Sequence, residues 1–324
     1  MDIYVKKAII HQFSPDDTDL YLADKFLNIT PKIEEYLRKK IERVYSDEAR
    51  TGIFEEDNPF LEMISDDLLE TSVAVANRWK EEFVVSENQK TNDLVFIQFS
   101  KEGVDHFAFL RIALRETLTH FGGEVDNPIK LTQNNLPGFG TGADEALVIN
   151  LQSRKYHLIE KRIKYNGTFL NYFSENLLQA QPKISPKKSI KALEKTAQRI
   201  AESFNTDDFQ FQSKVKSAIF NHIEEENKLS PEKLADDLFD DNLTARLSFI
   251  DQVKEAVPEP VTFEEIDASR QLKKFENQKL SLSNGIELIV PNNVYEDAES
   301  VEFILNENGT YSILIKNIED IQSK

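Results

Sequence analysis

Apolar and polar residues alternate in several short runs along the first half of the chain, and this two-residue period is typical of half-buried β-strands. Short polar or glycine-containing breaks separate successive runs, which favours antiparallel hairpins. The predicted strand pairs are residues 3–13 with 20–29, 94–99 with 106–114, and 146–151 with 155–163.

Other segments have apolar residues at three- and four-residue steps, which is the period of an amphipathic helix. Thr30 and Pro31 form a typical helix start, so a helix is predicted from there to about Asp47. A second helix, the longest in this half, is predicted from residue 58 to about Val84. After Gly167 the helical period dominates. Amphipathic helices are predicted at 170–178, 189–204, 211–226, 231–239 and 245–257.

The end of the chain returns to short alternating segments, with a turn sequence at 306–309 between the last two. We therefore predict an α+β fold. An N-terminal antiparallel sheet with helices is followed by a helical region that ends in a small antiparallel sheet at about 280–316. The N-terminal α+β domain is placed at residues 1–165 and the C-terminal helical domain at residues 166–324.

The composition excludes several classes of protein. Lys and Arg number 39 against 57 Asp and Glu, and the net charge of −18 argues against a polycation that coats nucleic acid. The absence of Cys excludes disulfides and cysteine nucleophiles and fits a reducing cytosol. Because no secretory signal or bilayer-spanning apolar run is recognised, we expect a soluble cytoplasmic protein without membrane contact.

The positive charge is concentrated in residues 151–199. This segment has 11 Lys and Arg against three Glu, a net charge of +8, which leaves −26 for the rest of the chain. Such a segment can bind a polyanion while the rest repels it, which favours limited, oriented contact. A helix would gather part of it along one side, namely Lys187, Lys188, Lys191, Lys195 and Arg199. The alternative is a basic face that is solvated or paired with acidic residues elsewhere.

No motif predicts an active site, and no catalytic residue, metal or cofactor is expected. The glycines at 138–142 form a loop that lacks the Lys-Ser/Thr of a phosphate loop and is followed by Asp144 and Glu145. The five His have no metal-ligand spacing. Adjacent acids could hold Mg²⁺ in a nuclease, although neighbouring side chains point apart. These pairs are Asp16 with Asp17, Asp66 with Asp67, Asp236 with Asp237, and Asp240 with Asp241.

Several short motifs follow one another along nearly the whole chain. They are KKAIIHQ at 6–12, RVYS at 43–46, TGIF at 51–54, NGTF at 166–169, RQLKKF at 270–275 and ILIK at 313–316. In this order, and in a chain of this length, they resemble the 37 kDa bacterial nucleoid-associated protein family (NdpA/YejK type). The resemblance implies a cytoplasmic protein of the bacterial nucleoid that binds DNA directly or through other proteins, with no catalytic residues to transfer.

Together, the basic segment and the resemblance predict non-catalytic, largely sequence-independent binding of DNA, with duplex expected, through backbone phosphates. The predicted contact residues are Arg154, Lys155, Lys161, Arg162, Lys164, Lys187, Lys188, Lys191 and Lys195. The many amphipathic helices leave room for a homodimer.

Two alternatives remain open at this point. One is an acidic adaptor, whose surface at 232–241 would bind a basic, chromosome-associated protein. The other is a metal-dependent nuclease.

Overall fold

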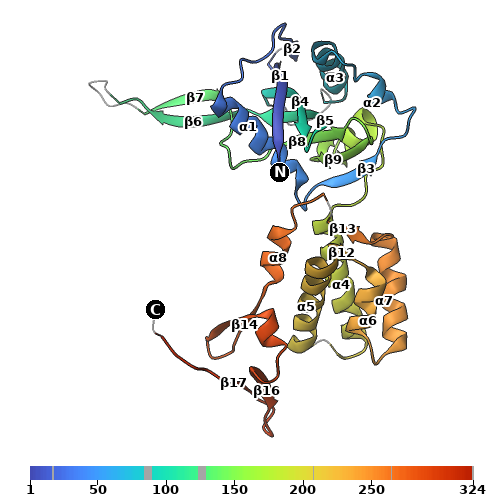
Figure 1. The fold of residues 1–324 in the computed structure, drawn as a ribbon, viewed down its shortest axis with the longest axis vertical. Coiled ribbons are helices and arrows are strands. Elements are labelled where there is room, and N and C mark those ends of the chain that lie inside the picture. Colours follow the sequence, from blue (N-terminus) through green and yellow to red (C-terminus); the bar gives the residue numbers. More distant parts are fainter. Residues whose placement is uncertain (17, 84–89, 123–128, 207, 264, 323–324) are drawn as a thin grey trace. The chain divides into compact units, whose positions relative to one another are not determined.

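The computed structural model describes residues 1–16, 18–83, 90–122, 129–206, 208–263 and 265–322. The chain divides into two compact units, Met1–Ser185 and Pro186–Lys324 (Figure 1). The first contains an antiparallel sheet with helices, and the second contains helices followed by small antiparallel hairpins. The predicted α+β fold class is therefore confirmed.

Unit 1 is built on a seven-stranded antiparallel sheet in the order β2-β1-β4-β5-β8-β9-β3. All three predicted strand pairs are present. The predicted strand at 20–29 is shorter than expected, because only its start pairs with β1 and the following backbone turns away, with Ala23 N donating to His11 Nδ1 at 3.0 Å. The strands are β1 (Ile3–Ser14), β2 (Asp19–Tyr21), β3 (Arg50–Ile53), β4 (Asn92–Lys101), β5 (Val104–Ala113), β8 (Glu145–Asn150) and β9 (Lys155–Ile159).

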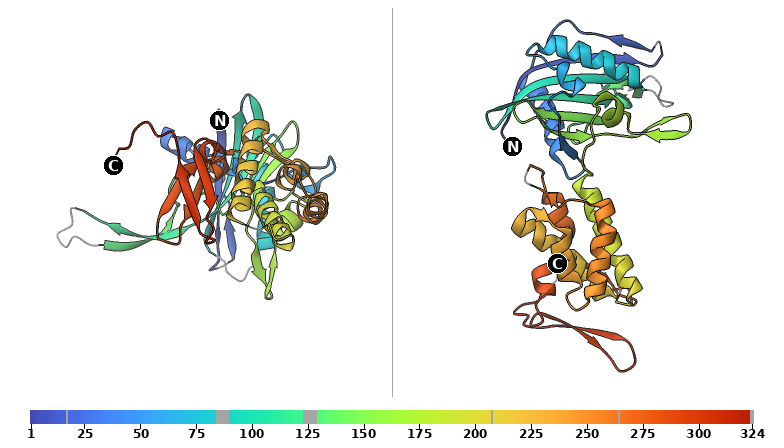
Figure 2. Two further views of the ribbon diagram at one scale, coloured as in Figure 1. Left: turned by 90° about the horizontal axis from the view of Figure 1, so that it is seen from below. Right: turned by 90° about the vertical axis from the view of Figure 1, so that its right-hand side faces the viewer.

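Helices cover both faces of this sheet (Figure 2). On one face, α1 (Pro31–Glu42) and the 3₁₀ turn η1 (Arg43–Tyr45) pack Leu37 and Ile41 onto the strands. On the other face, α3 (Leu68–Phe83) packs Trp79 against the aromatic side of the sheet. Since both faces are buried, the central strands contain continuous apolar runs, such as the four buried residues 94–97 of β4.

The first predicted helix is confirmed, and Thr30 caps it by accepting from Ile33 N at 3.4 Å. The single helix predicted from residue 58 is instead two, α2 (Pro59–Glu62) and α3. The break arises because Asp67 accepts from Leu69 N at 2.9 Å, as an N-cap does, and starts a new helix. The predicted end at Val84 lies outside the described residues.

An unpredicted two-stranded arm extends from the sheet (Figure 1). It consists of β6 (Arg115–His120) and β7 (Ile129–Asn135), paired in antiparallel register. The loop predicted at 131–142 is therefore a strand as far as Asn135. Leu118 and Leu131 lie opposite each other on the arm and are 71% and 55% exposed.

Residues 166–185 belong to unit 1, whereas the sequence placed the domain boundary at residue 165. They include the strand β11 (Thr168–Leu170), which pairs with β10 (Ile163–Tyr165), and the short π-helix η2 (Phe173–Leu177). Tyr172 and Phe173 are buried in the core of the sheet, and Trp79 Nε1 donates to the Tyr172 hydroxyl at 3.0 Å. This packing holds the segment on unit 1.

Unit 2 begins with four helices that pack around a common core, which includes Leu193 and Phe249. The four helices predicted after residue 185 are confirmed, and Asp208, Ser230 and Asn242 cap three of them. The elements are α4 (Pro186–Ser203), α5 (Phe209–Glu226), β12 (Lys228–Leu229), α6 (Pro231–Leu238), α7 (Leu243–Ala256), β13 (Val261–Thr262) and α8 (Ser269–Phe275).

The C-terminal strands form two hairpins, one of which turns at 306–309 as predicted. Their elements are β14 (Asn277–Ser281), β15 (Glu287–Pro291), α9 (Asn292–Tyr295), β16 (Val301–Leu305) and β17 (Tyr311–Ile315). Gln278 ties the first hairpin to α5 by donating to Ser213 O at 3.1 Å. Within the described ranges, no helix is long and apolar enough to cross a membrane.

Candidate nucleic-acid interface

The helix α4 separates apolar and basic residues onto opposite sides. Ile190, Leu193, Ala197 and Ile200 are buried in the core of unit 2. The basic residues of the helix are all exposed; they are Lys187, Lys188, Lys191, Lys195 and Arg199. At 3.6 residues per turn, these five lie within an arc of about 120°. The predicted gathering of these residues along one side of a helix is therefore confirmed, and we call them the α4 basic face.

The acidic residues of α4 have partners of their own. Glu194 accepts from Lys274 Nζ at 3.2 Å, and Glu202 accepts from Gln198 Nε2 at 3.2 Å. Within the part of the chain that the structure describes, Lys188, Lys191, Lys195 and Arg199 form no ion pair. Four cations of the α4 basic face are thus available to an external anion.

The α4 basic face belongs to an otherwise acidic unit. Residues 186–203 have a net charge of +3, whereas the remaining residues of unit 2 sum to −13. Since like charges repel a polyanion and opposite charges attract it, this distribution favours approach to α4 over approach to the rest of the unit.

The other predicted contact residues lie in unit 1, and several of them are already paired. Lys161 Nζ donates to Asp144 Oδ1 at 2.6 Å, and Arg154 is 3.1 Å from Glu56 Oε1. Arg162 Nε donates to Asn171 Oδ1 at 3.3 Å, and Lys155 and Lys164 also have partners. Of the nine predicted contact residues, five lie in unit 1 and four in unit 2. The five in unit 1 would have to give up existing contacts in order to bind phosphates.

The hairpin β10–β11 adds exposed aromatic rings to this basic segment. Tyr165 and Phe169 are 40% and 61% exposed, and Phe169 lies directly opposite Lys164. Asn166 and Gly167 turn the hairpin with φ of 48° and 77°. This hairpin was not predicted, although an Asn-Gly pair between alternating residues is a strong signal for it.

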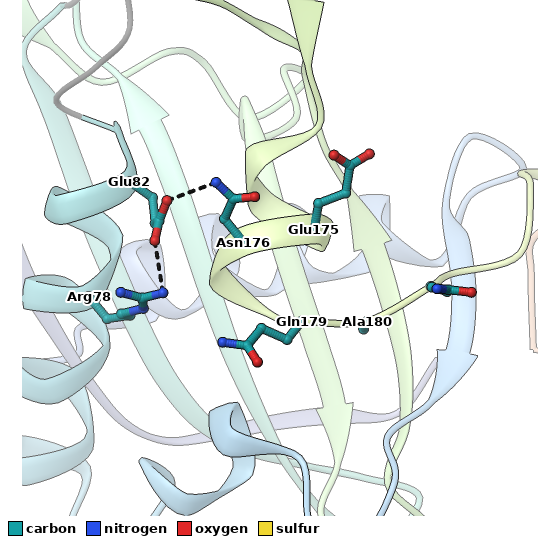
Figure 3. Close-up of a pocket in the computed structure, with 7 residues that line it drawn as sticks. Arg78, Glu82, Glu175, Asn176, Gln179 and Ala180 are labelled. Carbon is teal, nitrogen blue, oxygen red and sulfur yellow. Dashed lines mark hydrogen bonds and ion pairs between the residues drawn. The ribbon is translucent and has the colours of Figure 1, made fainter.

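A polar pocket of about 550 Å³ lies beside α3 (Figure 3). Arg78 lines it but is paired with Glu82 at 2.8 Å and with Glu81 at 3.0 Å. Asn176 of η2 also donates to Glu82, at 2.9 Å. Because Arg78 is the one cation among the described residues that line this pocket and is bound by two carboxylates, the pocket is a poor site for a polyanion.

Three acids of the pairs that could have held a metal have separate basic partners. Asp236 is 3.1 Å from Arg246, and Asp237 is 2.7 Å from His222 Nε2. Asp240 is 3.0 Å from Lys214, while Asp17 lies outside the described residues. Among the residues with described positions, no three His, Asp or Glu side chains converge as metal ligands would.

Comparison with known families gives one match over nearly the whole chain. Residues 9–321 match the family model NA37, described as nucleoid-associated protein YejK. No curated protein matches the chain.

Proposed function

Since the chain belongs to the family of nucleoid-associated protein YejK, we propose that it associates with the nucleoid by binding duplex DNA directly. In this proposal the α4 basic face contacts backbone phosphates, without catalysis and largely without sequence preference. The observation that supports it is a row of exposed cations on one helix, four of which have no carboxylate partner among the described residues.

The dimensions of α4 suit this role. From Lys187 to Arg199 the helix rises about 18 Å, at 1.5 Å per residue. This length corresponds to about five base pairs, at 3.4 Å for each phosphate step along a strand. Four of the five side chains are Lys, which contact phosphates as flexible point charges, and phosphate contacts carry no sequence information directly. Binding with little sequence preference is the expected result.

The basic residues of unit 1 would add weaker contacts. Lys161 must exchange Asp144 for a phosphate, and Arg154 must exchange Glu56. The exposed ring of Phe169 beside Lys164 could stack on an unpaired base at a strand end. We therefore expect charge reversal in this segment to weaken binding less than charge reversal on α4.

The predicted homodimer is part of the proposal. Two chains would present two α4 basic faces and so double the number of phosphate contacts. Sedimentation equilibrium measures the mass in solution directly, and a monomer at all concentrations would remove this part of the proposal.

A triple charge reversal, Lys188→Glu/Lys191→Glu/Lys195→Glu, tests the proposed interface. We expect it to weaken binding to a labelled duplex at least about tenfold in low salt, because three phosphate contacts become repulsions. The matched control is Lys228→Glu/Lys254→Glu/Lys279→Glu, which makes the same charge change at exposed positions elsewhere in unit 2. Equal binding by the two variants would show that only net charge matters and would contradict the proposed interface.

The adaptor alternative places the contact on the acidic segment 232–241. Several of its acids are already engaged, since Glu232 accepts from Ser230 Oγ at 2.8 Å, Asp236 and Asp240 are ion-paired, and Asp237 is hydrogen-bonded to His222. This pairing lowers the charge that the segment offers to a basic partner. Nucleoid association without any affinity for bare duplex would favour the adaptor.

A further inference from the structure

A buried lysine holds the loop that follows the β6–β7 arm. Lys40 of α1 is fully buried, and its ammonium donates to the carbonyl oxygens of Gly138 at 2.9 Å and Thr141 at 2.5 Å. The Tyr36 hydroxyl donates to Pro137 O at 3.0 Å. The loop is thereby fixed against α1, beside the base of the arm.

Two arginines add positive charge around Lys40. Burial and the charges of Arg43 and Arg115 together lower the pKa of Lys40 to about 8, against an opposing effect of Asp144. The side chain of Arg43 borders the same loop, because a Cβ added to Gly142 would lie 3.7 Å from it. In the described part of the chain, neither Arg43 nor Arg115 forms an ion pair.

A pocket of about 700 Å³ opens at the base of the arm. The register of β4 and β5 explains it, because the pairing of Asn92 with Ala113 places the residues before β4 beside those after β5. Leu114 N donates to Thr91 O at 2.9 Å, so Lys90 and Arg115 come to line one pocket. Both are exposed, and Lys90 also has no ion pair among the described residues.

The acids that line this pocket are occupied. Asp144 accepts from Lys161 Nζ at 2.6 Å and from Ala113 N at 2.9 Å. Burial alone would raise the pKa of Asp144, but these two hydrogen bonds and the charge of Lys161 lower it overall. Glu116 accepts from Gln133 Nε2 at 3.1 Å. The pocket therefore combines unpaired cations with carboxylates that already have donors.

We propose that this pocket binds a phosphate group, with Arg115 and Lys90 as its charged partners and Thr91, Gln133 and Asn134 as neutral donors. A guanidinium matches two phosphate oxygens at once, and the amide and hydroxyl groups can donate to the others. The inference rests on the proposed function in one respect: it takes the phosphate to be one of the DNA backbone. Unit 1 then has a phosphate site of its own, separate from the α4 basic face.

The test uses Lys90→Glu/Arg115→Glu in the full chain, with Lys25→Glu/Lys32→Glu as the control at exposed positions of unit 1. With labelled duplex, the loss of this one phosphate contact should reduce the magnitude of the slope of log K against log salt by about 0.9. The control should keep the slope of the unaltered protein. Far-ultraviolet circular dichroism of both variants establishes that they are folded.

A second experiment uses inorganic phosphate as the probe and compares it with chloride at equal ionic strength. Phosphate bound to the folded protein should raise Tm by about 2 °C, and Lys90→Glu/Arg115→Glu should abolish this rise. If the variant loses the phosphate-dependent rise in Tm but keeps the salt slope of duplex binding, the site is supported, and its ligand is free phosphate or a phosphorylated small molecule. If the variant changes neither the duplex slope nor the phosphate-dependent rise, the inference is overturned, whatever the α4 variants show.

Discussion

Glu194 lies beside the α4 basic face and is held by Lys274 of α8, whose Nζ is 3.2 Å from its carboxylate. Lys191 lies one turn before Glu194 on the same helix, at a spacing that allows ion pairs between side chains. Lys274 therefore keeps Glu194 away from the lysines that we propose to contact phosphates.

This relationship predicts an indirect effect on DNA binding. In Lys274→Ala, Glu194 is free to pair with Lys191, and an exposed helical pair of this kind contributes about 0.5 kcal/mol. The dissociation constant for duplex in low salt should rise about twofold. Fluorescence anisotropy measures the change, with Lys273→Ala as the control because it removes a neighbouring exposed charge. Equal affinities of the two variants would argue against a role for Glu194.

The proposal of a non-catalytic function makes a separate prediction. Plasmid and linear duplex incubated with the protein and Mg²⁺ or Mn²⁺ should remain intact. Among the described residues no three His, Asp or Glu side chains converge, and Asp236 and Asp240 are paired with Arg246 and Lys214. Agarose gels measure the products. Metal-dependent cleavage that is lost on replacing a single Asp by Asn would instead support the nuclease alternative.

Breaking a buried ionic network should strongly destabilise unit 1. Glu145 is fully buried and accepts from Arg111 Nε at 2.6 Å and from the Tyr172 hydroxyl, while Arg111 also donates to Asn92 at 2.9 Å. Replacing Glu145 by Ala leaves the Arg111 charge buried without its partner and should cost about 3–5 kcal/mol.

Urea unfolding followed by tryptophan fluorescence reports on this network, because Trp79 donates to Tyr172 within it. The control is Glu81→Ala, which breaks an exposed pair with Arg78 and should cost less than about 1 kcal/mol. If Glu145→Ala and Glu81→Ala lose similar amounts of unfolding free energy, the buried pair does not contribute more than the exposed pair, and this prediction is wrong.

We expect the stability of the protein to depend on pH through the buried side chain of His11. Burial lowers the pKa of His11 from 6.5 to about 4, so the folded protein holds this ring neutral. Between these values the unfolded chain binds the extra proton, and the free energy of unfolding should fall as the pH drops from about 6.5 to 4. A depression of this size corresponds to about 3 kcal/mol.

Urea titrations at several pH values measure the pH dependence of the free energy of unfolding. In His11→Gln the fall between pH 6.5 and 4 should be smaller, whereas His120→Gln, at an exposed position, should keep the full fall. If the free energy of unfolding falls with pH equally in the unaltered protein and in His11→Gln, other groups cause the acid sensitivity.

The helices and the paired strands of the sheet were predictable because each has one strong period and clear end signals. In α4, apolar residues such as Leu193 and basic residues such as Lys191 alternate with the helical period, so both the helix and its basic face followed from the sequence. The β6–β7 arm was not predictable in this way. Both of its faces are largely exposed, and no buried side imposes an alternation on its residues.

The charge count along the chain located the basic segment but could not divide it between the two units. That division depends on the packing of Tyr172 and Phe173 into the core of the sheet, which is a tertiary contact. The pocket at the base of the arm was missed for a similar reason. Lys90 and Arg115 are distant in sequence, and only the register of β4 and β5 brings them to one pocket.

The salt dependence of duplex binding by the unaltered protein tests the central claim most directly. Anisotropy titrations from about 50 to 200 mM salt give the slope of log K against log salt, and each neutralised phosphate contributes about −0.9. Contacts by four or five cations of the α4 basic face predict a slope between about −3.5 and −4.5, and further contacts from unit 1 would make it steeper. A slope near zero, or no binding to duplex at the lowest salt, would contradict direct binding through backbone phosphates.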